Sequence, residues 1–242
     1  MIDLHSHILP GLDDGAQSLQ DSLDMARMAV DSGITAMVAT PHCADDRRRE
    51  VYDAWILLQD ALQEMQIPLQ LYLGMEIFGT PDTPRLLRDE RLFTLNGSQY
   101  PLIEFAFRSD GEEETDILYR VCKAGFRPVV AHPERYVYIH DDPRILNRWC
   151  RMGCMLQVNR GSLMGRFGRH VQSLAVELVN RSFVTTIASD AHSAQMRTPW
   201  MDDIRKVLTQ EFSPEFAWTL LHDNPQTIIK NEDIHSAVPE WF

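Results

Sequence analysis

The first seven residues carry the clearest chemical signal in this chain. They read Met-Ile-Asp-Leu-His-Ser-His, so that a single residue separates the histidines His5 and His7. Successive side chains of a β-strand point to opposite faces, so His5 and His7 share a face with Asp3, whereas Ile2 and Leu4 face the other way. Imidazoles on one face of a strand suit a divalent metal ion better than they suit an apolar core. The alternative is a pair of ordinary surface histidines.

Further imidazole and carboxylate groups recur at the ends of the later apolar, β-branched segments. Glu104 is the most informative, because an acid inside the run Leu-Ile-Glu-Phe-Ala-Phe would cost several kcal/mol if it were buried without a partner. The candidate metal ligands are His5, His7, Asp14, His42, Glu76, Glu104, His132, Asp190 and His192. At about four to six ligands per ion, these groups predict two or three divalent ions. Ligation without thiolate favours manganese, iron or zinc over copper and leaves the choice among those three metals open.

Seven segments have the composition of strands and alternate with amphipathic helical patterns. The predicted strands are residues 2–5, 34–40, 69–76, 102–107, 128–131, 155–159 and 183–188. This alternation predicts an α/β fold with a parallel sheet and right-handed crossovers. The sheet is either closed, as a seven-stranded barrel, or open and doubly wound. A barrel gathers the carboxyl ends of its strands, and the polar residues of this sequence fall at those ends.

Helix signals separate these strands. Ser18 has the position of an N-cap for a helix over 18–32. Further helices are predicted over 46–65, 112–124, 143–152 and 169–181. Ser213-Pro214 and Asn224-Pro225 each have the pattern of a cap followed by a first-turn proline.

Bulk composition limits the class of protein. The 242 residues are 44% hydrophobic and 24% charged, which suits one domain spanning residues 1–242. The formal net charge of -12 argues against nucleic acid or an anionic membrane as a partner. No uncharged apolar run reaches 18 residues and no signal peptide precedes the histidine pair, so we expect a cytoplasmic protein without membrane insertion. The four cysteines lack zinc-binding spacing and are expected to be reduced thiols.

Together these motifs resemble the polymerase-and-histidinol-phosphatase (PHP) superfamily of metal phosphoesterases. Within it they are most similar to the bacterial PHP-type protein tyrosine phosphatases of capsule and exopolysaccharide systems. The resemblance extends from residue 1 to about residue 218. Its motifs are Asp3-Leu4-His5-Ser6-His7, Asp13-Asp14-Gly15, Thr40-Pro41-His42, Gly74-Met75-Glu76, Ile103-Glu104-Phe105, His132-Pro133-Glu134-Arg135-Tyr136 and Ser189-Asp190-Ala191-His192. Glutamate at position 104, where other branches usually have histidine, fits the tyrosine-phosphatase branch.

The resemblance implies a distorted seven-stranded (β/α)7 TIM-like barrel, the PHP fold, with a trinuclear metal centre. The implied ligand sets are His5, His7, Glu76 and Asp190 for the first ion, Glu76, Glu104 and His132 for the second, and Asp14, His42 and His192 for the third. In this pattern Glu76 bridges the first two ions.

The implied activity is hydrolysis of phosphotyrosine, with a bacterial tyrosine kinase of polysaccharide export as the protein substrate and a metal-bridging hydroxide as the nucleophile. Arg135 and Arg197 are the expected phosphate clamp, with Arg160 as a third candidate, because a guanidinium fork matches phosphate oxygens. Asp14 or His42 is the candidate for assisting the leaving group. Two alternatives are a small-molecule phosphatase of the histidinol-phosphatase type with the same metal site, and a metal-loaded adaptor without catalysis. No oligomeric state follows from these patterns.

A second motif suggests a different mechanism. His42-Cys43, five further residues and Arg49 match the His-Cys-x5-Arg loop of cysteine-dependent tyrosine phosphatases. That loop wraps phosphate with backbone amides, and glycine helps it to turn. The intervening residues here include two acids, which would repel a phosphate dianion, and no glycine. We therefore expect that Cys43 is not the nucleophile.

Overall fold

The computed structural model describes residues 1–43, 47–234 and 238–242. Parallel strands alternate with helices along the chain, as the sequence predicts. The strands are β1 (Ile2–Ser6), β2 (Ala36–Ala39), β3 (His42–Cys43), β4 (Gln70–Leu73), β5 (Glu76–Phe78), β6 (Leu102–Glu104), β7 (Val129–Ala131), β8 (Met155–Asn159) and β9 (Val184–Ala188). The α-helices are α1 (Leu19–Asp31), α2 (Arg48–Glu64), α3 (Thr83–Arg88), α4 (Glu112–Lys123), α5 (Val137–Asp141), α6 (Arg144–Arg151), α7 (Arg160–Leu163), α8 (Arg169–Asn180), α9 (Asp202–Glu211), α10 (Pro214–Trp218) and α11 (Asn224–Ile229). Short 3-10 helices cover Leu95–Gly97 and Pro133–Arg135, and a π-helix covers Thr219–Asp223.

The strands form two parallel sheets, in the orders β1-β2-β4 and β3-β5-β6-β7-β8-β9. Within the described residues the structure has nine strands where the sequence predicts seven, because β3 follows β2, and β5 follows β4, after a break of two residues. Pro41 lies in the first break and has no N–H for a ladder hydrogen bond. Beyond β1, the N–H of His7 donates to the Ala191 carbonyl (2.8 Å), and the N–H of Asp190 donates to the His5 carbonyl (2.9 Å). These bonds join the end of β1 to the segment after β9.

The predicted helices are present, with small differences at their ends. Ser18 is the N-cap of α1, where its hydroxyl accepts a hydrogen bond from a first-turn N–H. Ser213 caps α10 in the same way. Asn224 is not a cap, contrary to the prediction: the preceding π-helix runs directly into α11, and Asn224 Nδ2 donates to the Thr185 carbonyl of β9 (2.7 Å). The predicted start of the second helix at residue 46 lies outside the described residues.

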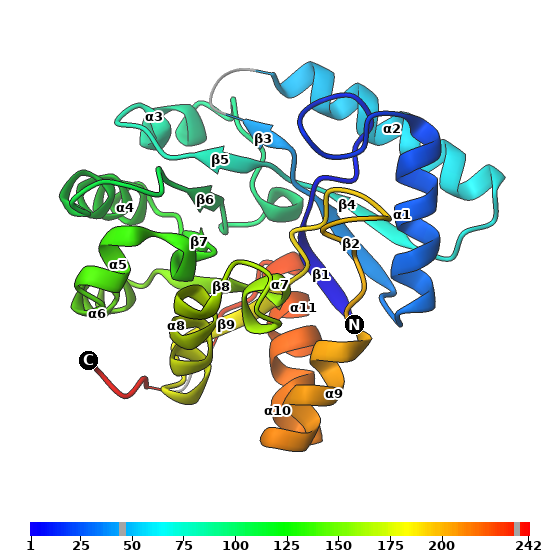
Figure 1. Ribbon diagram of the computed structural model, residues 1–242. Coiled ribbons are helices and arrows are strands. Elements are labelled where there is room, and N and C mark those ends of the chain that lie inside the picture. The colour runs from blue at the N-terminus through cyan, green and yellow to red at the C-terminus, as the bar shows by residue number, and fades with distance from the viewer. Residues whose placement is uncertain (44–46, 235–237) are drawn as a thin grey trace.

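The helices pack along the outside of the strands (Figure 1). Helices α1 and α2 accompany the β1-β2-β4 sheet, whereas α3, α4, α6 and α8 lie along the larger sheet. Ile2 and Leu4 of β1 belong to a smaller apolar cluster that includes the end of α11. Asp3 and His5, in contrast, form hydrogen bonds with polar groups from β8 and the end of β9. This arrangement confirms the predicted alternation of apolar and polar side chains along β1.

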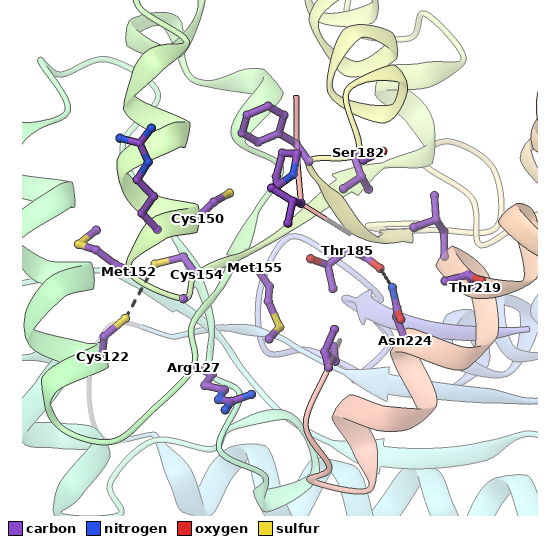
Figure 2. Close-up of a pocket in the computed structure, with 18 of the residues that line it drawn as sticks. Cys122, Arg127, Cys150, Met152, Cys154, Met155, Ser182, Thr185, Thr219 and Asn224 are labelled. Atoms are coloured by element: carbon purple, nitrogen blue, oxygen red, sulfur yellow. Dashed lines mark hydrogen bonds between the residues drawn. The ribbon is translucent and has the colours of Figure 1, made fainter. Parts of the chain in front are cut away.

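A cavity of about 860 Å³ lies at the amino-terminal ends of β8 and β9 (Figure 2). The residues that line it are far from the histidine pair in the sequence. Cys122, Cys150 and Cys154 line it, and the Sγ atoms of Cys122 and Cys154 are 4.0 Å apart. Neither these three cysteines nor Cys43 forms a disulfide, in agreement with the expectation of reduced thiols. In the part of the chain that the structure describes, no helix has the length and apolar character that crossing a membrane requires.

Candidate metal centre

The nine side chains predicted as metal ligands lie together, at or shortly after the carboxyl ends of β1, β2, β4, β6, β7 and β9; His42 and Glu76, which follow β2 and β4, are the first residues of β3 and β5. The nine side chains come from β1, β3, β5 and β6 and from the segments that follow β1, β7 and β9. Four groups have potential ligand atoms within 4.8 Å of one another: His7, Asp14, His42 and His192; His5, His7 and Asp190; His5, Glu76 and His132; and His42, Glu76 and Glu104. Each predicted ligand belongs to at least one group. The parallel direction of the strands explains this, because their carboxyl ends meet on one side.

Glu76 lies at the centre of the cluster and is fully buried at the start of β5. Its Oε2 atom is 3.0 Å from His42 Nδ1, 3.1 Å from His5 Nε2 and 3.2 Å from His7 Nε2. Its Oε1 atom is 2.9 Å from His132 Nε2. A carboxylate that faces four imidazoles has the placement that a bridge between two cations requires.

Several of these atoms approach one another without forming hydrogen bonds. His42 Nδ1 and Glu76 Oε2 are 3.0 Å apart, and Asp190 Oδ1 is 3.4 Å from His7 Nε2. Yet His42 Nδ1, Glu76 Oε2 and Asp190 Oδ1 are buried and have no hydrogen-bond partner among the described residues. An unsatisfied buried polar group costs about 1–3 kcal/mol, and cations between these atoms would remove that cost. Imidazoles and carboxylates without thiolate therefore fit divalent metal ions.

In two central imidazoles, the ring nitrogen Nδ1 forms a hydrogen bond with a residue outside the predicted ligand set. His7 Nδ1 donates to Asp13 Oδ2 at 2.7 Å, and His5 Nδ1 donates to Gln157 Oε1 at 2.8 Å. When these rings are neutral, the bonds fix the tautomer in which Nε2 carries no hydrogen and is directed towards the centre of the cluster. Burial alone would raise the pKa of Asp13, but its hydrogen bond to His7 lowers that pKa well below the usual range.

The loop after β1 packs closely on His7. A Cβ atom at position 15 would lie 2.2 Å from the His7 carbonyl oxygen, so the close approach requires Gly15. Asp13 accepts hydrogen bonds from the N–H groups of Gly15 and His42, both at 2.9 Å. The carboxylate of Asp13 therefore ties this loop to β3 while it orients His7.

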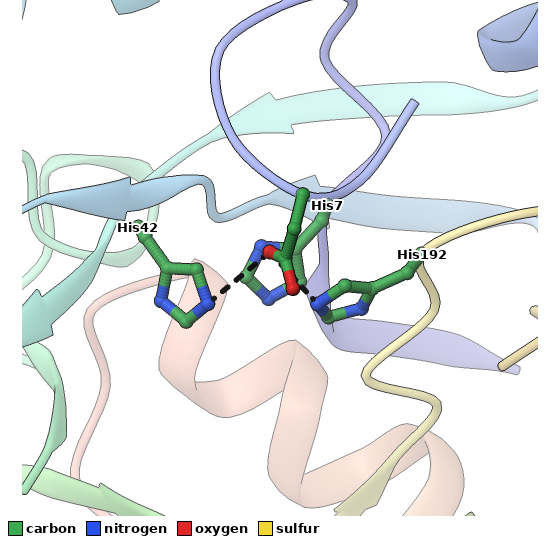
Figure 3. Close-up of side chains that lie close together, drawn as sticks. His7, His42 and His192 are labelled. Atoms are coloured by element: carbon green, nitrogen blue, oxygen red, sulfur yellow. Dashed lines mark ion pairs between the residues drawn. The ribbon is translucent and has the colours of Figure 1, made fainter. Parts of the chain in front are cut away.

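Asp14 lies at the exposed edge of the cluster. Its Oδ1 atom is 3.5 Å from His42 Nε2 and 3.3 Å from His192 Nε2. Figure 3 shows the imidazoles of His7, His42 and His192 gathered around one carboxylate, with these two ion pairs drawn as dashed lines. The structure thus brings together the three residues that the family pattern assigns to the third ion.

The charges of the cluster shift the pKa values of two imidazoles in opposite directions. Burial alone would lower the pKa of His42, but the carboxylates of Glu104 and Glu76 raise it to about 10. Burial, together with the positive charge of His7, lowers the pKa of His192 to about 4. Without bound ions, His42 is therefore protonated at pH 7 and His192 is neutral.

Two of the predicted ligands have a strained backbone. The φ angles of His132 and Asp190 are 36° and 51°, in the left-handed region that residues other than glycine rarely adopt. His132 follows β7 directly, and its N–H donates to the Gln157 carbonyl (2.8 Å). Asp190 follows β9, where its N–H is held by the His5 carbonyl. Such strain persists only where the surroundings hold it, and it is concentrated at functional sites.

Gln157 and Asn159 of β8 are not among the predicted metal ligands, yet both support the cluster. Gln157 Nε2 donates to Asn159 Oδ1 at 2.7 Å, and Asn159 Nδ2 donates to Asp190 Oδ2 at 2.6 Å. With the bond from His5 to Gln157, a chain of hydrogen bonds joins two predicted ligands. The signal in the sequence is the two-residue spacing of two amides at the end of a strand, the same spacing as that of His5 and His7.

Of the three candidate arginines, Arg135 and Arg197 reach the cluster, where they contact the same carboxylate, whereas Arg160 pairs with Asp203 of α9. Arg197 Nη2 donates to Asp190 Oδ2, and its Nη1 donates to His192 Nε2 at 2.9 Å. Arg135 Nη1 is 3.4 Å from Asp190 Oδ2. Both guanidinium groups therefore lie beside the potential ligands, where a phosphate group could reach them.

Cys43 does not have the surroundings of a phosphatase nucleophile. It lies in β3 with 4% of its surface exposed. The side chain of Arg49, which would complete a phosphate loop, is 93% exposed and lies 3.7 Å from Asp53 on α2. Residues 44–46, which would form most of such a loop, lie outside the described residues. A buried thiol and an arginine directed to solvent agree with the expectation that Cys43 is not the nucleophile.

The fold and the cluster define a class of α/β protein in which the carboxyl ends of parallel strands carry a potential site for several divalent ions. The chain belongs to the CpsB/CapC family of capsular polysaccharide synthesis, whose sequence pattern matches residues 1–230.

Relatives of the chain carry consistent names. It is 34% identical over 244 residues to the tyrosine-protein phosphatase YwqE of Bacillus subtilis, covering 99% of this chain and 96% of YwqE. It is 31% identical to the putative tyrosine-protein phosphatase CapC of Staphylococcus aureus, over 100% of this chain and 99% of CapC.

Solved structures agree with this family. One from a study of YwqE from B. subtilis and CpsB from Streptococcus pneumoniae, described as unique metal-dependent tyrosine phosphatases, superposes with a TM-score of 0.93 at 34% identity, covering 100% of this chain and 99% of the other. A lactonase of Listeria monocytogenes, with a TM-score of 0.59 at 12% identity over 96% of this chain and 95% of the lactonase, shares the fold alone.

Proposed function

We propose that this protein is a metal-dependent protein-tyrosine phosphatase that removes phosphate from phosphotyrosine on a bacterial tyrosine kinase and so acts in capsule or exopolysaccharide synthesis. The observation that carries the proposal is the convergence of nine imidazole and carboxylate groups at one side of the strands. The chain is also 34% identical over nearly its whole length to a tyrosine-protein phosphatase.

The nine clustered groups would hold two or three divalent ions, with manganese as the first expectation and iron or zinc as the alternatives. When bound, these ions would supply positive charge for the phosphoryl oxygens and a water molecule of lowered pKa. Asp13 and Gln157 would keep His7 and His5 in the tautomer that binds a cation.

Arg135 and Arg197 would bind the phosphoryl group. Both now donate to Asp190 Oδ2, so a phosphoryl oxygen would replace this carboxylate oxygen as their acceptor. Two guanidinium groups aimed at one point stabilise the charge that phosphoryl transfer gathers on the non-bridging oxygens.

The tyrosyl leaving group needs little assistance from the protein. A phenol has a pKa of about 10, so a tyrosyl leaving group needs little protonation. Asp14 and His42 line the exposed edge of the cluster, and we assign to one of them the role of assisting the departure of the phenolate oxygen.

The architecture that goes with this function is a distorted seven-stranded barrel in one domain, residues 1–242. The bonds of His7 and Asp190 across the β1–β9 junction support a closed ring of strands. The breaks after β2 and β4, where two strands pass from one sheet to the other, account for the distortion. The four cysteines, none of which forms a disulfide, support a reducing, cytoplasmic location.

The test combines elemental analysis of the purified protein with an assay on a phosphotyrosine peptide after chelation and after adding back manganese, iron or zinc. We expect more than one equivalent of metal, loss of turnover on chelation and recovery on add-back. His7→Ala should lose both metal and turnover, whereas His170→Ala on the exposed surface of α8 should keep both.

Three results would contradict the proposal. Undiminished turnover after chelation would exclude the metal centre. A strong preference for histidinol phosphate over phosphotyrosine would favour the small-molecule phosphatase. Absence of hydrolysis of any phosphomonoester by manganese-loaded protein would favour the adaptor.

A further inference from the structure

We propose that Phe107 determines the specificity of this site, because its ring forms a subsite for an aromatic leaving group next to the phosphate-binding Arg135. The inference rests on the proposed function, since it assumes that a phosphoryl group binds at the cluster. It goes beyond that function by naming the residue that would distinguish an aryl phosphate from an alkyl phosphate.

Phe107 lies in the segment after β6, beside the predicted ligands. Its ring centroid is 5.9 Å from that of His132, with 66° between the two planes. The guanidinium carbon of Arg135 lies over the Phe107 ring, 4.6 Å from its centroid. Phe107 is nevertheless 41% exposed, so a large part of the ring remains open beside an imidazole and an arginine of the site.

The segment that carries Phe107 is fixed by the residues that follow β7. The N–H of Val137 donates to the Phe107 carbonyl at 2.8 Å. The N–H of Phe105 donates to Tyr136 Oη at 3.0 Å, and that hydroxyl donates to the Ala131 carbonyl at 2.8 Å. The exposed ring therefore belongs to a pre-formed surface, and binding against it requires little ordering of the protein.

Arg135 links this ring to the phosphate-binding groups. Its guanidinium carbon also lies over the ring of Phe167, 4.4 Å from the centroid, while Nη1 donates to Asp190 Oδ2 at 3.4 Å. The guanidinium thus contacts two aromatic rings and has one amino group directed to the cluster. A phosphoryl oxygen at that amino group would place its ester substituent next to Phe107, where a phenyl ring gains an aromatic contact that a short alkyl group lacks.

The experiment measures binding rather than turnover. Phenylphosphonate and methylphosphonate are non-hydrolysable and differ only in the substituent, so their dissociation constants are compared by calorimetry with manganese-loaded protein. We expect Phe107→Ala to raise the dissociation constant of phenylphosphonate about five- to tenfold and to change that of methylphosphonate less than about twofold. Phe107→Trp should retain the preference for phenylphosphonate.

Two control variants separate this effect from others. Phe212→Ala removes a phenylalanine of equal exposure (41%) from the segment after α9 and should change neither constant. Phe167→Ala removes the other ring that contacts Arg135 and should raise the dissociation constants of both phosphonates to the same extent.

The inference is overturned if Phe107→Ala leaves phenylphosphonate binding unchanged, or if it weakens both phosphonates equally, as expected for a residue that only supports Arg135. If the proposed function is wrong, the results will differ from these: the wild-type protein would bind neither phosphonate, or would bind both and hydrolyse no phosphotyrosine peptide.

Discussion

The imidazole of His7 and the carboxylate of Asp13 form a hydrogen bond of 2.7 Å that connects the end of β1 to the loop behind it. Because the bond occupies Nδ1, it leaves Nε2 to face Glu76 and Asp190. Asp13 belongs to none of the groups that could hold an ion among the described residues, and yet it controls the direction of a residue that belongs to two of them.

We expect Asp13→Ala to lower the metal affinity about 10–100-fold without abolishing binding, because carboxylates that orient metal-binding histidines contribute about this much. Turnover should fall at limiting manganese and recover at excess manganese. Asp24→Ala, which removes an exposed carboxylate from α1, is the matched control. Wild-type metal affinity in the Asp13→Ala protein would show that the bond has no such role.

Replacing Arg197 should affect the chemical step more than the metal content. Arg197→Met removes two charge-assisted donors beside Asp190 and His192, and we expect kcat/KM on a phosphotyrosine peptide to fall about 100- to 1,000-fold. Metal content, measured by elemental analysis, should stay near the wild-type value. Arg144→Met on the exposed surface of α6 serves as the control. Unchanged kcat/KM would show that Arg197 does not contribute to binding the phosphoryl group.

Cys43→Ser tests the cysteine mechanism directly. The thiol is buried in β3, and we expect turnover within about twofold of the wild type, since a buried serine in its place leaves the metal-binding groups untouched. Rates are measured on a phosphotyrosine peptide at saturating manganese. A loss greater than about 100-fold with normal metal content would indicate that the thiol takes part in the reaction.

Metal affinity should rise with pH. In the protein without ions the carboxylates of Glu104 and Glu76 raise the pKa of His42 to about 10, so His42 carries a proton throughout the neutral range. An imidazole must lose that proton to bind a cation, so metal binding releases at least one proton and the apparent affinity increases at least about tenfold per pH unit below pH 10.

Competition with a chromogenic chelator at several pH values, with proton release measured in weak buffer, checks this expectation. His42→Gln should reduce the slope by about one proton, and His170→Gln should leave it unchanged. An affinity that is independent of pH would mean that His42 is neutral before the ion binds.

Much of the site could be predicted from local sequence because the direction of each side chain depends on its position within a single strand. The two-residue spacing of His5 and His7 places them on one face of any strand, and the polar residues that end successive parallel strands must meet on one side of the sheet. The position of Glu104 within an apolar run is enough to require a polar partner for its carboxylate, and that carboxylate lies 2.8 Å from His42 Nδ1. These inferences depend on geometry that every strand shares.

Only the tertiary structure decided which groups touch. The contact of His42 with Glu104, the role of Gln157 in holding His5, and the stacking of Arg135 on Phe107 all join residues from different strands or the segments after them. Such contacts depend on strand register, on twist and on the breaks between β2 and β3 and between β4 and β5, which arise from packing of the whole sheet. The chain by itself therefore determined which chemical groups reach the site, and long-range packing determined their distances, because no local rule sets the register between strands that are far apart in sequence.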